Sequence, residues 1–243
     1  MVKEKSVSFK RTDKDLPLFM MNAVKNIADH FSTQRERIYV KDFLEIFKRS
    51  KYWEINSLEK DLNNWKLRFV KSHNDRDKLS KIIVDSFIQC RSKDDIDHLR
   101  GVLLEGILIG AKGGFKTIDS RKESVRGWGA KVYLQKEKSG VFYNCTRRLE
   151  DNCANRSTVD YGEWDGYHGQ FFECKVSPDR IGCKEVSYMR FLKEQLMSHD
   201  ISHEIFFLCA ETKFNIEIQL EKYDLGPTFK PLGRDEISEM LVN

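Results

Sequence analysis

Hydrophobic residues recur at intervals of three and four through the first third of the chain, which is the spacing of amphipathic helices. Apolar runs predict helices within residues 16–27, 40–47, 58–69 and 79–88. Another helix is expected from about Asp95, where Ser92 or Asp94 can cap the first turn, and it should end before Gly113 and Gly114. Residues 1–92 are therefore expected to form a helical module for recognition, docking or dimerisation.

The pattern changes beyond Ala111, where a polar and basic stretch leads to Arg126. Short stretches of β-branched and aromatic residues then alternate with turn residues. A strand, helix and strand in succession favour an α/β fold with a mixed central sheet flanked by helices. This second domain is expected to span residues 93–243. Its expected strands lie at about 128–136, 140–146, 156–164, 170–177, 204–211 and 214–221, and its expected helices at 184–198 and 234–241.

The segment 156–176 holds the most informative polar residues. Glu173 and Lys175 lie two residues apart on an expected strand, so their side chains project from the same face. Turn residues between 165 and 169 predict a hairpin that places Asp160 beside Glu173. Two carboxylates this close repel each other and require a cation or a proton to compensate.

A divalent cation is the expected compensation. Mg²⁺, or Mn²⁺ in its place, suits the site because it takes one or two protein carboxylates and fills its other positions with water or phosphate. Lys175 would then stand beside the metal, which would lower its pKa. It could help to deprotonate a water nucleophile or balance the charge that develops on a phosphate.

Asp160, followed by Glu173-Cys174-Lys175, resembles the core motif of the PD-(D/E)XK, or restriction-endonuclease-like, nuclease superfamily, with Val159 in place of the proline. The resemblance covers approximately residues 95–220. It implies a restriction-endonuclease-like core in which Asp160 and Glu173 bind metal, the Cys174 carbonyl is a further ligand and Lys175 is catalytic. Glu105, on the helix before the first core strand, would complete the water network of the metal.

The resemblance also implies a function. It predicts a metal-dependent endonuclease that hydrolyses phosphodiester bonds, with DNA favoured over RNA and with restriction or phage defence as a setting. The alternative is a catalytically silent module of the same fold that binds nucleic acid or a protein partner. A phosphatase or phosphodiesterase for small molecules is less favoured, because no P-loop motif and no H-E-x-x-H motif is present in the sequence.

Simpler interpretations exist for the same residues. Glu173 and Lys175 could form an exposed ion pair on a strand, which would contribute less than about 1 kcal/mol. The same triplet pattern recurs at 211–213, although no hairpin leads to that copy from the acidic residue upstream. Glu105 could belong to the solvent-facing stripe of an ordinary amphipathic helix.

Charge and composition suit a nucleic-acid partner. Residues 1–100 hold 22 Lys and Arg against 16 Asp and Glu, whereas residues 101–243 hold 20 against 22. A basic first half could gather phosphates, although a solvated helical surface would carry similar charges. Arg121, Lys122 and Arg126 precede Trp128 in a loop that could grip a nucleic-acid backbone and stack on a base, the default being a solvated loop with one packed Trp.

The compartment is inferred from what the sequence lacks. It has no apolar run of the length that spans a membrane and no apolar stretch near Met1, so a cytoplasmic protein without a membrane partner is expected. Its six cysteines are then expected to be reduced. The spacing of Cys145, Cys153 and His168 matches no standard zinc pattern. A homodimer or a protein partner is compatible with the helical module.

Overall fold

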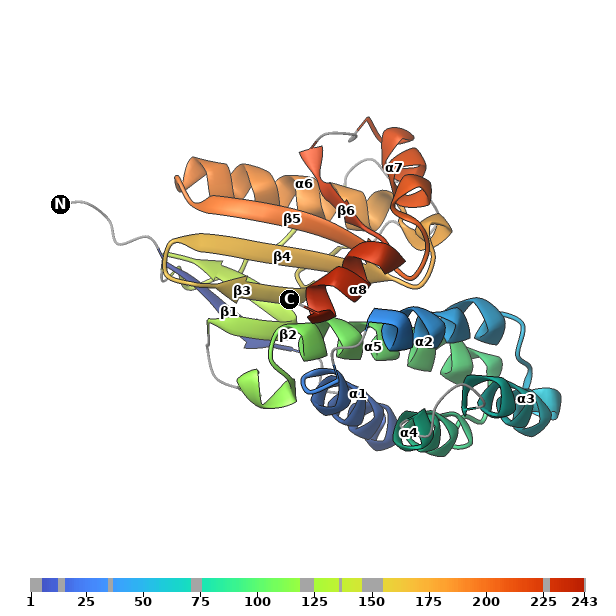
Figure 1. Ribbon diagram of the computed structural model, residues 1–243. Helices are drawn as coiled ribbons and strands as arrows, with labels where there is room; N and C mark the ends of the chain where they lie inside the picture. The colour runs from blue at the N-terminus through green and yellow to red at the C-terminus, as the bar shows by residue number, and fades with distance from the viewer. Residues whose placement is uncertain are drawn as a thin grey trace. The chain divides into compact units, whose positions relative to one another are not determined.

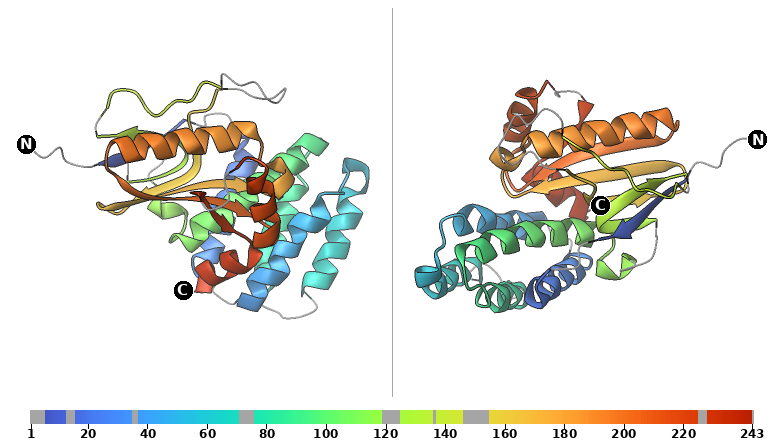
Figure 2. Two further views of the ribbon diagram at one scale, coloured as in Figure 1. Left: turned by 90° about the horizontal axis from the view of Figure 1, so that it is seen from above. Right: turned by 180° about the vertical axis from the view of Figure 1, so that it is seen from behind.

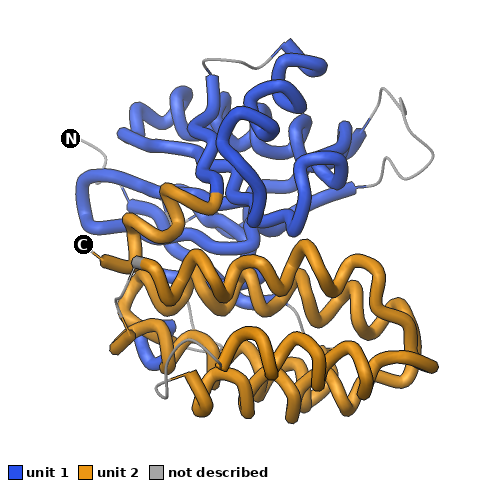
Figure 3. The backbone as a smooth tube through the Cα atoms, turned by 45° about the vertical axis from the view of Figure 1, so that its right-hand side comes forward, with its two compact units in different colours: residues 1–14, 116–233 blue, residues 15–115, 234–243 orange. Residues whose placement is uncertain are grey.

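The computed structural model describes residues 6–12, 16–34, 37–70, 76–118, 125–135, 137–145, 155–224 and 228–242. The chain forms two compact units (Figure 3), with residues 1–14 and 116–233 in unit 1 and residues 15–115 and 234–243 in unit 2. The structure thus does not divide at the expected boundary between residues 92 and 93. The helix that begins at Lys93 belongs with the other helices, and the N-terminal strand belongs with the sheet.

Unit 2 is built from helices, as the apolar spacing of this part of the chain predicts. Ser92 caps α5 by accepting a hydrogen bond from the Asp95 amide, and the Asp95 carboxylate accepts one from the Ser92 amide. Gly110 of α5 lies against α1, where an added Cβ would come within 2.7 Å of the Phe31 Cβ. The helices of the unit are α1 (Leu18–Phe31), α2 (Arg37–Ser50), α3 (Leu58–Val70), α4 (Asp77–Phe87), α5 (Lys93–Ala111) and α8 (Arg234–Val242).

The C-terminal helix α8 joins unit 2 through ion pairs with α2. Lys41 Nζ lies 2.6 Å from Asp235 Oδ1, and Arg234 Nη1 lies 3.4 Å from Glu45 Oε1. These pairs connect residues nearly two hundred positions apart in sequence, which the local apolar pattern does not reveal. Within the described parts of the chain, no helix has both the length and the apolar character required to cross a membrane.

Unit 1 contains one six-stranded mixed sheet with the strand order β1-β2-β3-β4-β5-β6 (Figure 1). Neighbouring strands from β1 to β4 are antiparallel, whereas β4, β5 and β6 are parallel. Helix α6 (Cys183–Ser198) connects β4 to β5, and α7 (Lys213–Glu221) connects β5 to β6. The strands are β1 (Val7–Arg11), β2 (Arg126–Leu134), β3 (Val159–Trp164), β4 (His168–Lys175), β5 (Ser202–Cys209) and β6 (Lys230–Leu232).

Helix α6 lies along the sheet of unit 1 in both views of Figure 2. Its apolar residues Met189, Leu192 and Leu196 are buried in one hydrophobic core with Phe171 of β4 and Phe207 of β5. Helical spacing of three and four residues puts the three α6 side chains on the face that meets the sheet. The α/β class and the mixed sheet predicted from the sequence are confirmed.

Two expected strands are wrong. The segment 214–221 is helix α7, although its apolar residues alternate as in a strand. Thr212 caps it by accepting the Asn215 amide, and Ile216 and Leu220, four residues apart, are buried on one side. The segment 140–146 forms no strand in its described part, where only Tyr143 makes an isolated bridge, to Arg156. The short strands β1 and β6 were not predicted.

Candidate active site

The β3–β4 hairpin forms as the turn residues predict. Tyr161 pairs with Phe172 and Gly162 with Phe171, and one step further in this antiparallel register Asp160 lies opposite Glu173. The Asp165 carboxylate closes the turn by accepting the amides of the residues two and three positions further along, at 2.8 and 2.7 Å. Two acidic side chains are thereby placed next to each other on adjacent strands.

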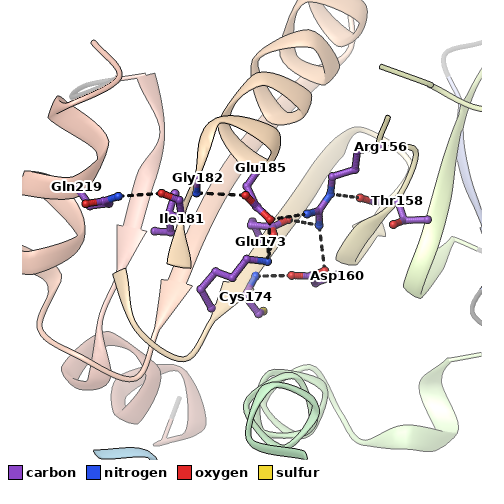
Figure 4. Close-up of polar contacts among 10 residues, drawn as sticks. Arg156, Thr158, Asp160, Glu173, Cys174, Ile181, Gly182, Glu185 and Gln219 are labelled. Atoms are coloured by element: carbon purple, nitrogen blue, oxygen red, sulfur yellow. Dashed lines mark hydrogen bonds and ion pairs between the residues drawn. The ribbon is translucent and has the colours of Figure 1, made fainter. Parts of the chain in front are cut away.

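The two carboxylates belong to a cluster of charged side chains (Figure 4). Arg156 Nη2 donates to Glu173 Oε2 at 2.5 Å and to Asp160 Oδ1 at 3.2 Å. Lys175 Nζ donates to Glu173 Oε1 at 2.5 Å. Glu185 Oε1, from the first turn of α6, lies 3.3 Å from Arg156 Nη1 and 3.5 Å from Lys175 Nζ. When all are ionised, three carboxylates and two cations give a formal charge of −1.

Burial makes this cluster different from a surface ion pair. Glu173 is completely buried, and the Arg156 side chain is only 9% exposed. Asp160 and Lys175 keep 18% and 21% of their side-chain surface exposed, so the cluster can be approached from solvent on their side. The alternative in which Glu173 and Lys175 form an exposed pair is therefore wrong. Charges buried this deeply cost several kcal/mol each unless partners compensate them.

The backbone also helps to fix the acidic residues. The Cys174 amide donates to Asp160 Oδ2 at 2.7 Å, which leaves Asp160 Oδ1 directed at Arg156. The Gly182 amide donates to Glu185 Oε2 at 3.2 Å at the start of α6. Hydrogen bonds from the main chain hold a side chain without the entropy cost of a second flexible partner. The carboxylates are thus oriented by the sheet and by the helix N-terminus.

Electrostatics in the cluster shift several pKa values. Burial raises the pKa of Glu173 to about 7, although Arg156 opposes the shift. Burial alone would lower the pKa of Lys175, but Glu173 and Asp160 outweigh it and raise that pKa well above its usual range. Without a metal, Lys175 is therefore an ammonium ion that can balance negative charge. The lowered pKa was expected beside a bound metal, and it stays a prediction.

Tyr188, one turn along α6 from Glu185, has a buried hydroxyl beside the cluster. Among the described residues, no hydrogen-bond partner is found for its Oη. Its ring centre lies 5.8 Å from Arg156 Cζ. Burial raises the pKa of the Tyr188 hydroxyl, which is therefore protonated and able to donate. Buried polar groups in folded proteins nearly always have partners, so this hydroxyl calls for an explanation.

Arg156, Glu185 and Tyr188 were not identified from the sequence. Arg156 precedes β3 and forms no motif with Asp160, and Glu185 and Tyr188 belong to a helix whose apolar residues identify only its core face. One signal was present, because Glu185 is the third residue of α6, the position from which a Glu side chain can accept the amide of the residue that precedes the helix. Long-range packing of α6 on the sheet brings these residues to the cluster.

The other expected site residues lie outside the cluster. Arg121 and Lys122 fall outside the described residues. Arg126 Nε lies 3.5 Å from Glu163 Oε2, so it pairs with an acidic residue of β3. Trp128 is only 1% exposed, and the Arg11 guanidinium lies 4.1 Å from its ring centre. This is the packed Trp of the default interpretation, and its ring offers no free face for a base.

Glu105 lies on α5 in unit 2 and is half-buried. The hydrogen bonds of the charged cluster given above all join residues of unit 1. The role of Glu105 in a metal's water network therefore stays a prediction. The second Glu-x-Lys triplet, at 211–213, lies at the junction between β5 and α7 rather than on a strand, which supports the choice of the first copy.

Two oxygen atoms of the cluster are placed as ligands of the expected metal would be. Asp160 Oδ1 and Glu173 Oε2 both lie within 3.2 Å of one nitrogen, Arg156 Nη2, so two carboxylate oxygens converge on a single point. A typical Mg²⁺ site takes one or two carboxylate ligands from the protein and fills its other positions with water or phosphate. No group of three or more His, Cys, Asp or Glu side chains arranged around a possible metal position occurs in the described residues. The pair fits a divalent cation only if Arg156 moves.

Comparison with known proteins adds little to this geometry. No protein-family model matches the chain, and no curated protein matches it. Among solved structures, it is similar to protein VC1899 from Vibrio cholerae, with 10% sequence identity and a TM-score of 0.41. The match covers 98% of this chain and 57% of that protein, so this chain spans little more than half of its length. At this level of similarity the match carries no weight for function.

Proposed function

We propose that the protein is a metal-dependent nuclease that hydrolyses phosphodiester bonds of nucleic acid, with DNA favoured over RNA. The observation that carries the proposal is the convergence of Asp160 and Glu173 on one point, with Lys175 beside them on the same strand face. This arrangement agrees with the resemblance of these residues to the PD-(D/E)XK motif. Mg²⁺, or Mn²⁺ in its place, is the proposed cofactor.

In the proposed mechanism, Asp160 and Glu173 would hold the cation, and the Cys174 carbonyl would be a further candidate ligand. When bound, a divalent cation supplies Lewis-acid chemistry, which makes water a stronger nucleophile and polarises the phosphate. Lys175, as an ammonium ion on the same strand face as Glu173, would stabilise the negative charge that develops on the phosphate oxygens. The buried surroundings strengthen this interaction, because few water molecules screen it.

The proposal is tested by incubating the protein with labelled duplex DNA, single-stranded DNA and RNA in Mg²⁺, Mn²⁺ or EDTA. Metal-dependent cutting is expected, with DNA cut faster than RNA. Lys175→Ala should slow it by a factor of about 10² to 10³, the usual effect of losing one group that stabilises transition-state charge. Lys230→Ala is the matched control, because Lys230 pairs with Glu204 on β5 and should leave cutting unchanged.

Circular dichroism would establish that both variants fold. Cutting that is equally fast in EDTA, or equally fast in Lys175→Ala, would contradict the proposed mechanism.

A second candidate function is a catalytically silent module that binds nucleic acid or a protein partner. The observation that favours it is Arg156, which already bridges the two carboxylates where a metal would bind. In that case, the cluster is a structural ion network. Binding of nucleic acid without cutting in any metal, together with no affinity for Mn²⁺, would support this candidate over the nuclease.

A further inference from the structure

Arg156 occupies the one point on which the Asp160 and Glu173 carboxylates converge. Its Nη2 lies 2.5 Å from Glu173 Oε2 and 3.2 Å from Asp160 Oδ1. Its Nε donates to the Thr158 carbonyl at 3.1 Å, and its Nη1 lies 3.3 Å from Glu185. A divalent cation bound by the same two oxygens would overlap Nη2 and would be repelled by its charge. The guanidinium and a bound cation therefore exclude each other.

The charges of the cluster favour such an exchange. With Arg156 in place and all groups ionised, three carboxylates face two cations and the formal charge of the cluster is −1. If Arg156 leaves and a divalent cation enters, the three carboxylates are balanced by Lys175 and the metal, and the formal charge is zero. A buried cluster is most stable when its charge is fully compensated.

The attachment of Arg156 to the fold allows its side chain to move. Its backbone pairs with Tyr143 through two hydrogen bonds, at 2.8 and 3.0 Å, before β3 begins. The long side chain alone connects this anchored backbone to the cluster. Rotation about the bonds of this side chain would therefore move the guanidinium without a shift of the strands that carry Asp160 and Glu173.

The Tyr188 hydroxyl is a second, independent observation that points to a ligand at the cluster. The ring centre of Tyr188 lies 5.8 Å from Arg156 Cζ, and the described residues offer its buried hydroxyl no hydrogen-bond partner. An unsatisfied buried hydroxyl costs about 1–3 kcal/mol. An arrangement in which a ligand oxygen enters the cluster would give this donor an acceptor.

We propose that Arg156 is a built-in competitor of the divalent cation: it holds the Asp160–Glu173 point in the metal-free protein, leaves when the cation binds, and then offers its guanidinium to a phosphate group. This regulation of the site rests on the proposed nuclease function. A free guanidinium matches phosphate well, because its parallel N–H groups can donate to two oxygens. Metal and substrate would thus each favour the same displaced position of Arg156.

The test is isothermal titration of Mn²⁺ at pH 8 into wild type, Arg156→Met and Arg156→Gln. Removing the competitor should tighten Mn²⁺ binding at least tenfold in both variants. Arg126→Met is the matched control, because Arg126 pairs with Glu163 elsewhere in the sheet, and its affinity should equal that of wild type. Equal or weaker binding after removal of Arg156 would overturn the proposal.

A measurement on the wild type covers the case in which neither variant folds. The side-chain Nε–H resonance of Arg156, assigned by NMR, should shift on addition of Mg²⁺ as its bond to the Thr158 carbonyl breaks. A resonance that does not change at saturating Mg²⁺ would overturn the proposal. The two proposals can fail separately. If Mn²⁺ binds more tightly without Arg156 but the protein cuts no nucleic acid, the competition between Arg156 and the cation is supported and the nuclease function is refuted.

Discussion

Asp160→Asn separates the structural role of the cluster from its proposed chemistry. The amide oxygen of asparagine can still accept the Cys174 amide, now 2.7 Å from Asp160 Oδ2, so the strand contact is kept. The substitution removes the charged interaction between Asp160 Oδ1 and Arg156, which lie 3.2 Å apart. Hydrogen bonds to charged groups contribute about 1.5–3 kcal/mol, and this long, partly exposed one lies near the lower limit. The free energy of unfolding should therefore fall by about 1–2 kcal/mol.

Metal binding should respond more strongly than stability. Asparagine supplies a neutral oxygen in place of a carboxylate, so Mn²⁺ affinity should fall at least about tenfold, equivalent to about 1.4 kcal/mol. Glu163→Gln is the control, because Glu163 lies on the same strand, faces the other way and pairs with Arg126. Calorimetry measures the affinity, and urea unfolding measures the stability. A loss of stability with unchanged Mn²⁺ affinity would refute the ligand role of Asp160.

Two further predictions concern the stability of the two units. Burial lowers the pKa of His30 to about 4. The stability that the neutral His30 contributes should therefore be fully present above pH 6.5. The free energy of unfolding should fall by up to about 2–3 kcal/mol as the pH drops through 4, because the unfolded chain takes up the proton first. Urea unfolding against pH should show a flatter dependence in His30→Gln, and an identical profile would contradict this. Gly162→Ala should destabilise unit 1 by about 1–3 kcal/mol in thermal melts, because its Cβ would overlap the buried Phe9 ring; an unchanged melting temperature would contradict that packing.

The hairpin could be predicted from the sequence because its determinants are local. Alternation along β4 fixes which face Glu173 and Lys175 share, and turn residues fix the register that brings Asp160 opposite Glu173. The cap of α5 was equally accessible, because Ser92 and Asp95 lie three residues apart. In such cases the interacting residues are close in sequence or related by one tight turn.

Features that depend on distant packing were not predictable in this way. The alternation in α7 indicates a strand, and only burial of Ile216 and Leu220 against the rest of unit 1 selects the helix. Strand β1 pairs with β2 across more than one hundred residues, which no local pattern records. For the same reason Arg156 was missed, since its importance arises only when α6 and the hairpin surround it.

Crystals soaked in Mn²⁺ and measured for anomalous diffraction would test the central claim most directly, namely that Asp160 and Glu173 form a divalent-cation site. The expected result is an anomalous peak between the two carboxylates, with the Arg156 side chain displaced from its present position 2.5 Å from Glu173. Density for Arg156 still bridging Asp160 and Glu173 at saturating Mn²⁺, with no peak between them, would contradict it.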